Sequence, residues 1–279
     1  MKLGVVSRSF PKMTSDQAAD FMARNGFVCT ELCLAHPDAD YWVYNGRRDL
    51  AAFTDARSRA VVEAFRGRGI EVSALGVFTN LIEPDAAERA ANLAYFERMM
   101  QIAALNGIPC VSTECGFVPG RRGVNTDTYE RDFGQLGESL QWLAGKAEHY
   151  QVEIALEPCV IDIVPSAKRA ADLLAQLGSD RIRILLDPAN LIANSTEEEM
   201  FRHLAPKIAY FHGKDRKVND VRGRAFGDGD IDWPRFLGLY HRHAEGRPFI
   251  LEYVGPENVL AIRDRVLRAD AAGRLAGDR

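Results

Sequence analysis

Residues 152–187 read VEIALEPCVIDIVPSAKRAADLLAQLGSDRIRILLD and contain the repeating unit of the whole chain. Two short apolar runs, 152–157 and 182–187, enclose a longer segment that opens at Pro165-Ser166 and closes at Leu177-Gly178. Short apolar runs are typical of strands that are buried on both faces, whereas an opening Pro-Ser and a closing Gly are typical of a helix. The stretch therefore predicts strand, helix and strand in a parallel sheet.

The same unit recurs along the chain. Eight strand candidates lie at residues 3–7, 28–32, 71–76, 109–114, 152–157, 182–187, 208–212 and 248–253. Helix signals recur between them, for example at 14–26, at 84–107 and after residue 256. Eight such units without a linker or low-complexity segment favour a closed barrel over an open, doubly wound sheet. We therefore expect residues 1–279 to form one α/β domain, a single (β/α)8 TIM barrel.

The composition excludes several classes of protein. The formal net charge of −4 does not supply the basic surface with which nucleic-acid binders neutralise phosphates, so we expect no nucleic-acid partner. The N-terminus has too short an apolar run for a signal peptide, and no segment approaches the roughly 20 apolar residues of a membrane span. We expect a cytoplasmic protein without a membrane partner.

The cysteines do not indicate a disulfide framework or a zinc ribbon. They form an odd set of five without C-x-x-C spacing, and no Gly-flanked nucleophile motif accompanies any of them. We expect thiols in or near the core rather than a catalytic cysteine. The five residues are Cys29, Cys33, Cys110, Cys115 and Cys159.

Strands five to eight each end on a residue that can bind a metal ion. The strand ends read ALEP, LLDPAN, YFHGKD and ILEY, and the residues are Glu157, Asp187, His212 and Glu252. The carboxyl ends of barrel strands meet at one face, where the loops form active sites. Each acid alone could instead cap a helix or pair with a Lys or Arg. Four such residues in phase favour a shared cation, because unpaired buried carboxylates are costly.

The donor set indicates which cation would bind. Three carboxylates and one imidazole form a hard, oxygen-rich set that suits Mn²⁺, Mg²⁺ or Co²⁺, while Zn²⁺ stays open. We expect one divalent ion, with Mn²⁺ as the first choice.

The four strand ends, H-x-K-D at 212–215 and GDGDIDW at 227–233 resemble the xylose isomerase-like TIM barrel superfamily over essentially the whole chain. The superfamily includes sugar phosphate isomerases and epimerases, ketose 3-epimerases, hydroxypyruvate isomerases and inosose dehydratases. The resemblance implies that the four residues bind one metal ion and that Glu157 and Glu252 also act as acid and base. It implies proton abstraction next to a metal-bound carbonyl of a sugar or keto-polyol, through an enediolate. The resemblance leaves open whether the protein forms a homo-oligomer.

The sequence departs from the tagatose-type 3-epimerases within this superfamily. Asn190 stands where those enzymes have a substrate-binding His, and Ile163 stands where they have a Glu. Val218 replaces an Arg, although Arg216 is close enough to substitute. These departures put a free-ketose 3-epimerase in doubt but leave the superfamily resemblance intact.

Other residues near the strand ends are candidates for substrate binding. Each has a simpler structural interpretation, such as a helix cap, a solvated ion pair or an aromatic ring that closes a barrel end. Arg216 and its basic neighbours could also hold a phosphate or carboxylate. The candidates are Asn190, Lys214, Asp215, Arg216, Glu114, Trp42 and His36.

Two other enzyme classes and one non-enzymatic class stay open. An inosose- or dehydroshikimate-type dehydratase would use the same metal and the same proton abstraction. An endonuclease IV-like phosphodiesterase would need further His ligands, and Asn190 stands where one of them is expected. A barrel that only binds a sugar would not need a complete set of metal ligands.

Overall fold

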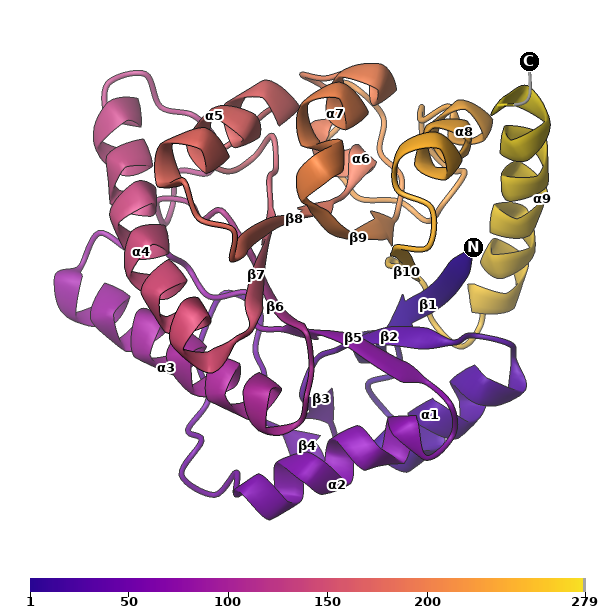
Figure 1. The fold of residues 1–279 in the computed structure, drawn as a ribbon, viewed down its shortest axis with the longest axis horizontal. Coiled ribbons are helices and arrows are strands. Elements are labelled where there is room, and N and C mark those ends of the chain that lie inside the picture. Colours follow the sequence, from indigo (N-terminus) through magenta and orange to yellow (C-terminus); the bar gives the residue numbers. More distant parts are fainter. Residues whose placement is uncertain (278–279) are drawn as a thin grey trace.

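The computed structural model describes residues 1–277 and shows eight parallel strands closed into a barrel (Figure 1). The closed order is β1-β10-β9-β8-β7-β6-β5-β2, because β1 pairs with both β2 and β10. The predicted (β/α)8 TIM barrel is confirmed. The barrel strands are β1 (Lys2–Val6), β2 (Cys29–Leu32), β5 (Glu71–Gly76), β6 (Cys110–Glu114), β7 (Glu153–Glu157), β8 (Ile182–Leu186), β9 (Ile208–Gly213) and β10 (Pro248–Leu251).

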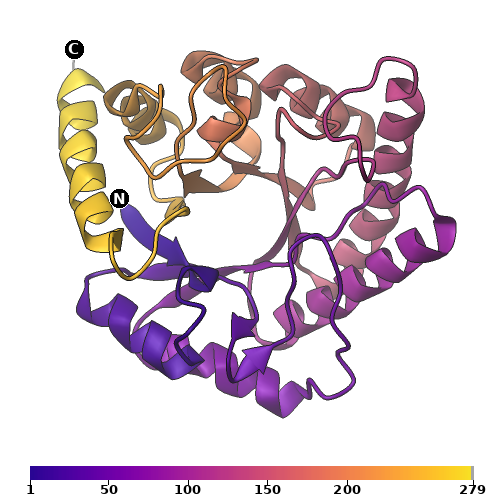
Figure 2. The same cartoon turned by 180° about the vertical axis from the view of Figure 1, so that it is seen from behind.

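Helices surround the ring of strands, and α9 packs beside α8, so that both ends of the described chain lie on one side of the barrel (Figures 1 and 2). Each strand leads into one helix, except that β8 leads into two. The helices are α1 (Ser15–Arg24), α2 (Asp55–Arg66), α3 (Ala86–Leu105), α4 (Tyr129–Tyr150), α5 (Ala167–Leu177), α6 (Pro188–Leu191), α7 (Glu197–Leu204), α8 (Trp233–His243) and α9 (Val259–Gly277), with short 3-10 turns η1 (Ser7–Ser9) and η2 (Ala205–Lys207).

The helix ends follow the signals in the sequence. At the start of α5, the Ser166 hydroxyl accepts a hydrogen bond from the Arg169 amide at 3.2 Å. At its end, Gly178 adopts a φ of 61°, the left-handed conformation that favours glycine after a helix. The βαβ stretch 152–187 therefore folds as the sequence predicts.

The structure differs from the sequence prediction mainly in the loops. A small antiparallel hairpin, β3 (Ala35–His36) and β4 (Ala39–Asp40), lies in the long loop after β2. Strands of two residues are too short to produce a periodic pattern, which explains why the sequence does not reveal them. The predicted eighth strand continued to Tyr253, whereas β10 ends at Leu251 and Tyr253 has a left-handed φ of 55°.

Inside the barrel, each strand contributes one residue to an apolar layer. Cys29, Ala155, Leu185, Tyr210 and Ile250 belong to this buried cluster, which is separate from the large core beneath the helices. Side chains alternate between the two faces of a strand, so a residue two positions later also points inward. The residues two positions after the apolar-layer residues therefore form the next layer inside the barrel, nearer the carboxyl ends of the strands.

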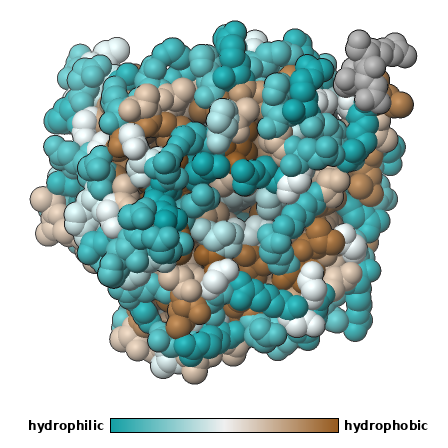
Figure 3. Space-filling model, viewed as in Figure 1, coloured by the Kyte–Doolittle hydropathy of each residue, from teal (hydrophilic) through white to brown (hydrophobic). Residues whose placement is uncertain are grey.

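The five cysteines are buried and free, as expected for core thiols. Burial raises the pKa of Cys29 and of Cys159 to about 12, which keeps both thiols protonated at neutral pH. Hydrophilic side chains cover most of the face seen in Figure 3, with scattered apolar residues between them. Among the described helices, none is long and apolar enough to span a bilayer.

Candidate metal and catalytic site

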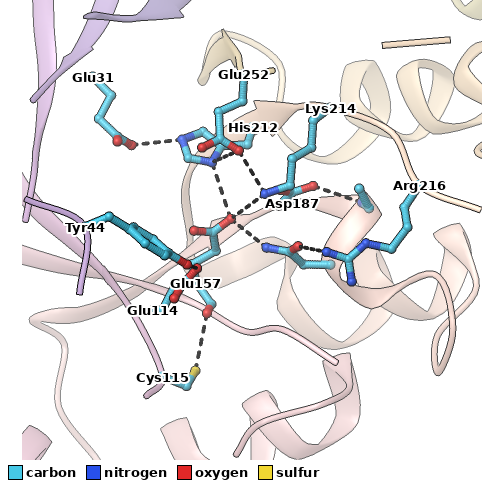
Figure 4. A network of polar contacts seen from close by, with 12 residues as sticks. Glu31, Tyr44, Glu114, Cys115, Glu157, Asp187, His212, Lys214, Arg216 and Glu252 are labelled. Atoms are coloured by element: carbon cyan, nitrogen blue, oxygen red, sulfur yellow. Dashed lines mark hydrogen bonds and ion pairs between the residues drawn. The ribbon is translucent and has the colours of Figure 1, made fainter. Parts of the chain in front are cut away.

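A layer of polar side chains follows the apolar layer at the carboxyl ends of the strands. Glu157, Asp187, His212 and Glu252 each stand two positions after an apolar-layer residue, and each is at most 4% exposed. The strand period thus directs all four side chains into the barrel mouth (Figure 4). We call these residues, with their interior neighbours Arg8, Glu31 and Gly76, the polar layer.

Three of the four predicted metal ligands lie close enough to share one ion. One ligand atom from each of Glu157, Asp187 and His212 lies within 4.8 Å of the others. Asp187 also caps α6, because its Oδ1 accepts a hydrogen bond from the Ala189 amide at 2.9 Å. Its Oδ2 has no hydrogen bond of good geometry in the described structure and faces the Lys214 ammonium at 2.7 Å. Asp187 can therefore cap α6 with one carboxylate oxygen and face the site with the other.

The imidazole of His212 has one engaged and one free nitrogen. Nε2 lies 2.9 Å from Glu31 Oε2, whereas Nδ1 has no hydrogen-bond partner among residues 1–277. Nδ1 lies 3.4 Å from Glu157 Oε1, so it points at the carboxylates. A buried nitrogen without a partner, next to carboxylates, fits a residue that binds a divalent cation.

Glu31 is a member of the site that the sequence prediction missed. It is completely buried on β2, where it also accepts a hydrogen bond from the Tyr210 hydroxyl. Gly76 on the neighbouring strand makes room for it, because a Cβ at Gly76 would lie 2.5 Å from Glu31 Oε1. A carboxylate in the middle of the short predicted strand around CTEL is the signal that could have revealed it.

Glu252 lies at the edge of the site and is held by two positively charged side chains. Its Oε2 accepts a hydrogen bond from Lys214 Nζ at 2.8 Å, and its Oε1 contacts Arg8 Nη2. Arg8 follows β1 and was also missed from the sequence. Glu252 Oε2 is 3.8 Å from His212 Nδ1, and Lys214 Nζ lies between Glu252 and Asp187.

Charges within the layer shift the pKa values of its members. Burial opposes ionisation of Glu157, but Lys214 and His212 lower its pKa to about 2. Burial likewise opposes protonation of His212, but the carboxylates of Glu31 and Glu157 raise its pKa to about 9. Burial raises the pKa of Asp187, with a further contribution from Glu157. Glu157 therefore stays ionised at neutral pH, as does Glu31, whose pKa is lowered by His212 against the effect of burial.

A second polar cluster adjoins Glu157. Glu114 on β6 pairs with Glu157 in register, and it accepts hydrogen bonds from the Tyr44 hydroxyl at 2.6 Å and from Arg122 at 3.2 Å. Arg122 also lies 3.6 Å from the buried Asp162. Burial and the charge of Glu157 raise the pKa of Glu114, and burial and Glu114 raise the pKa of Asp162. This cluster joins the loops after β2, β6 and β7.

Asn190 and Arg216 extend the site on the other side of Glu157. Asn190 Nδ2 donates to Glu157 Oε1 at 2.8 Å, and its Oδ1 accepts from Arg216 Nη2 at 3.2 Å. Arg216 is only 4% exposed, and its Nε and Nη1 have no partner in the described part of the chain. Asn190 thus links Glu157 to Arg216.

Three other candidates have different surroundings. Asp215 accepts hydrogen bonds from the Arg216 and Gly227 amides and from Trp233 Nε1, so its carboxylate holds the GDGDIDW loop in shape. Trp42 lies beside the site, with the Arg8 guanidinium 5.7 Å from its ring centre. His36 is buried in the hairpin, where Nδ1 lies 2.9 Å from the Met13 carbonyl oxygen. This contact ties His36 to the chain before α1 rather than to the polar layer.

The fold and the site together define a barrel with buried carboxylates and a histidine at the carboxyl end of its strands. The family model for the xylose isomerase-like TIM barrel matches residues 19–272, and the chain belongs to this family. A search of curated protein sequences gives no significant match.

Solved structures share the fold at low sequence identity. A D-psicose 3-epimerase determined in the presence of D-fructose is 17% identical, with a TM-score of 0.75 and coverage of 99% of both chains. The 3-keto-D-glucoside 4-epimerase YcjR from E. coli is 14% identical, with a TM-score of 0.75 and coverage of 97% of this chain and 99% of that one. The IolI protein with a bound zinc atom is 17% identical, with a TM-score of 0.75 and coverage of 99% of this chain and 98% of that one.

Proposed function

We propose that the protein is a sugar isomerase or epimerase that depends on one divalent cation, with Mn²⁺ as the first choice. Glu157, Asp187 and His212 would hold the ion, and Glu252 would complete the set. The observation that carries the proposal is the free Nδ1 of His212, which faces the carboxylates of Glu157 and Glu252 at 3.4 and 3.8 Å in the described structure. The family membership and the epimerases among the structural neighbours support it.

The bound ion would polarise a substrate carbonyl and so make the proton on the neighbouring carbon more acidic. Glu157 is ionised at neutral pH, as the acceptor of that proton must be, and Asn190 fixes its Oε1. Glu252 follows β10, three strands along the barrel from β7, and is held by Lys214 and Arg8. Two carboxylates that approach from different strands can remove a proton from one face of a carbon and return one to the other.

The stereochemical result depends on where the proton returns. Return to the opposite face of the same carbon inverts it, whereas return to the neighbouring carbon interconverts an aldose and a ketose. General acid and base groups of this kind contribute roughly 10²- to 10⁴-fold in rate.

The surroundings of the two glutamates indicate a polyhydroxylated substrate. Glu114, Lys214, Asn190 and Arg216 provide hydrogen-bonding groups around Glu157, and Trp42 provides an apolar ring at the edge. This combination suits a sugar or keto-polyol, whose ring has polar edges and an apolar face.

The proposal can be tested with a panel of ketoses, keto-inositols and keto-glycosides in the presence of Mn²⁺, with products identified by NMR and mass spectrometry. We expect an isomer of unchanged mass from at least one sugar and none after chelation of the metal. A product lighter by one water would identify a dehydratase instead. Conversion that persists unchanged after complete removal of the metal would contradict the proposal.

A further inference from the structure

We propose that the Lys214 ammonium and a divalent cation compete for the same carboxylates, so that binding of the cation moves Lys214 out of the polar layer. The inference rests on the proposed cation site but does not depend on any sugar substrate. It assigns Lys214 two alternative positions, one among the carboxylates and one at the barrel mouth.

Lys214 Nζ lies at the centre of the carboxylates. It is 2.7 Å from Asp187 Oδ2, 2.8 Å from Glu252 Oε2 and 3.7 Å from Glu157 Oε1. The Lys214 side chain is 8% exposed, so the ammonium has lost most of its contact with water. Buried charges of one sign need a partner of the other sign, and here one ammonium contacts three carboxylates, of which Glu252 also contacts Arg8.

The same ammonium lies between Glu252 and Asp187. Glu157, Asp187 and His212 gather within 4.8 Å, whereas Lys214 Nζ stands between Asp187 and Glu252. Small divalent cations such as Mg²⁺ and Zn²⁺ bind carboxylate oxygens at about 2.0–2.2 Å. An ion that bound Asp187 Oδ2 and Glu252 Oε2 at such distances would take the place of Nζ. An ion and an ammonium at one position would overlap and repel each other, so Lys214 would move away when the ion binds.

The Tyr253 ring provides a second position for the displaced Lys214 ammonium. The ring centre of Tyr253 lies 5.4 Å from Nζ, and Tyr253 is 54% exposed at the barrel mouth. Tyr253 is held there in a left-handed conformation with a φ of 55°, which is uncommon for a bulky residue. It packs on Gly223, where a Cβ would lie 2.6 Å from Tyr253 Cε1. An aromatic face attracts an ammonium, so a displaced Lys214 would remain next to a bound substrate.

Lysine accessibility tests the inference directly in the wild-type protein. Brief reductive methylation, read by mass spectrometry, would be compared with and without MnCl₂, while electron paramagnetic resonance counts the bound Mn²⁺. We expect the labelling rate of Lys214 to rise at least tenfold when one Mn²⁺ is bound. Lys146 and Lys207, which each pair with one acid near the surface, should label equally in both samples. Unchanged labelling of Lys214 with one Mn²⁺ bound would overturn the inference, as would failure to bind Mn²⁺ at all.

A substitution provides a second measurement. Lys214→Met removes the competing ammonium, so we expect Mn²⁺ to bind at least tenfold more tightly than in the wild type. Lys217→Met removes an exposed charge from the same loop and should leave the affinity within about twofold. Equal affinity of Lys214→Met and wild type would overturn the inference. Should Lys214→Met not fold, the labelling of the wild type decides. Neither readout uses turnover, so a failure of the sugar proposal would be seen separately.

Discussion

Glu31 Oε2 lies 2.9 Å from Nε2 of His212, although 181 positions separate the two residues in the chain. This contact occupies Nε2 and leaves Nδ1 directed at Glu157. A histidine that binds a metal ion through one ring nitrogen commonly donates a hydrogen bond from the other ring nitrogen to a carboxylate. This hydrogen bond fixes the orientation of the ring. Glu31 therefore acts as a positioning residue, and it belongs to the site as much as the predicted ligands do.

Substitution Glu31→Gln should weaken metal binding, because the amide loses the charge that supports the imidazole. We expect Mn²⁺ affinity to fall by about 10- to 100-fold, measured by calorimetric titration. Glu71→Gln is a matched control, since Glu71 begins the neighbouring strand β5 with its side chain 47% exposed. Equal loss in both variants, or no loss in Glu31→Gln, would show that Glu31 does not position His212.

Metal affinity should depend on pH through His212. Burial alone would lower the pKa of this imidazole from 6.5, but Glu31 and Glu157 raise it to about 9. Below that pH the ring is protonated, and a cation must displace the proton from Nδ1. Affinity for Mn²⁺ should therefore rise by about tenfold per pH unit between pH 7 and 9 and then level off. Calorimetry at pH 7.5 in two buffers of different ionisation enthalpy should detect the release of about one proton; release of none would contradict this assignment.

The loop after β9 should not tolerate a side chain at Gly229. A Cβ there would lie 2.6 Å from the Arg216 amide nitrogen and 2.5 Å from its carbonyl oxygen. Gly229→Ala should reduce the free energy of unfolding by about 1–3 kcal/mol, measured by chemical denaturation. A Cβ at Gly137 in α4 would meet no neighbouring atom of the described structure within 4 Å, so Gly137→Ala should instead stabilise by about 0.5–1 kcal/mol. Similar effects of the two substitutions would argue against close packing around Gly229.

The barrel could be predicted because its signals are local. Each strand and each helix cap lies within a few residues of its own pattern, and the four strand-end residues share one position in successive units. The hairpin around His36 could not be predicted, because two-residue strands have no detectable period. Glu31 was missed because its partner comes from β9, far away in the sequence.

The directions of the Lys214 and Asp215 side chains also could not be predicted from the sequence. The sequence places Lys214 and Asp215 next to each other after His212, where they could be a solvated pair. The barrel instead directs Lys214 into the carboxylates and Asp215 towards Trp233. Such opposite roles for neighbouring residues depend on the path of the loop, which no local pattern specifies.

In the proposed function, Glu157 and Glu252 move a proton on a substrate carbon. The most direct measurement is solvent deuterium uptake next to the carbonyl, followed by NMR in D₂O for the sugar that the panel identifies, with Mn²⁺ present. We expect Glu157→Gln and Glu252→Gln each to reduce the uptake rate by roughly 10²-fold or more, while Glu153→Gln, at the opposite end of β7, keeps it. Uptake at the wild-type rate in either of the first two variants would contradict the proposed role of that glutamate.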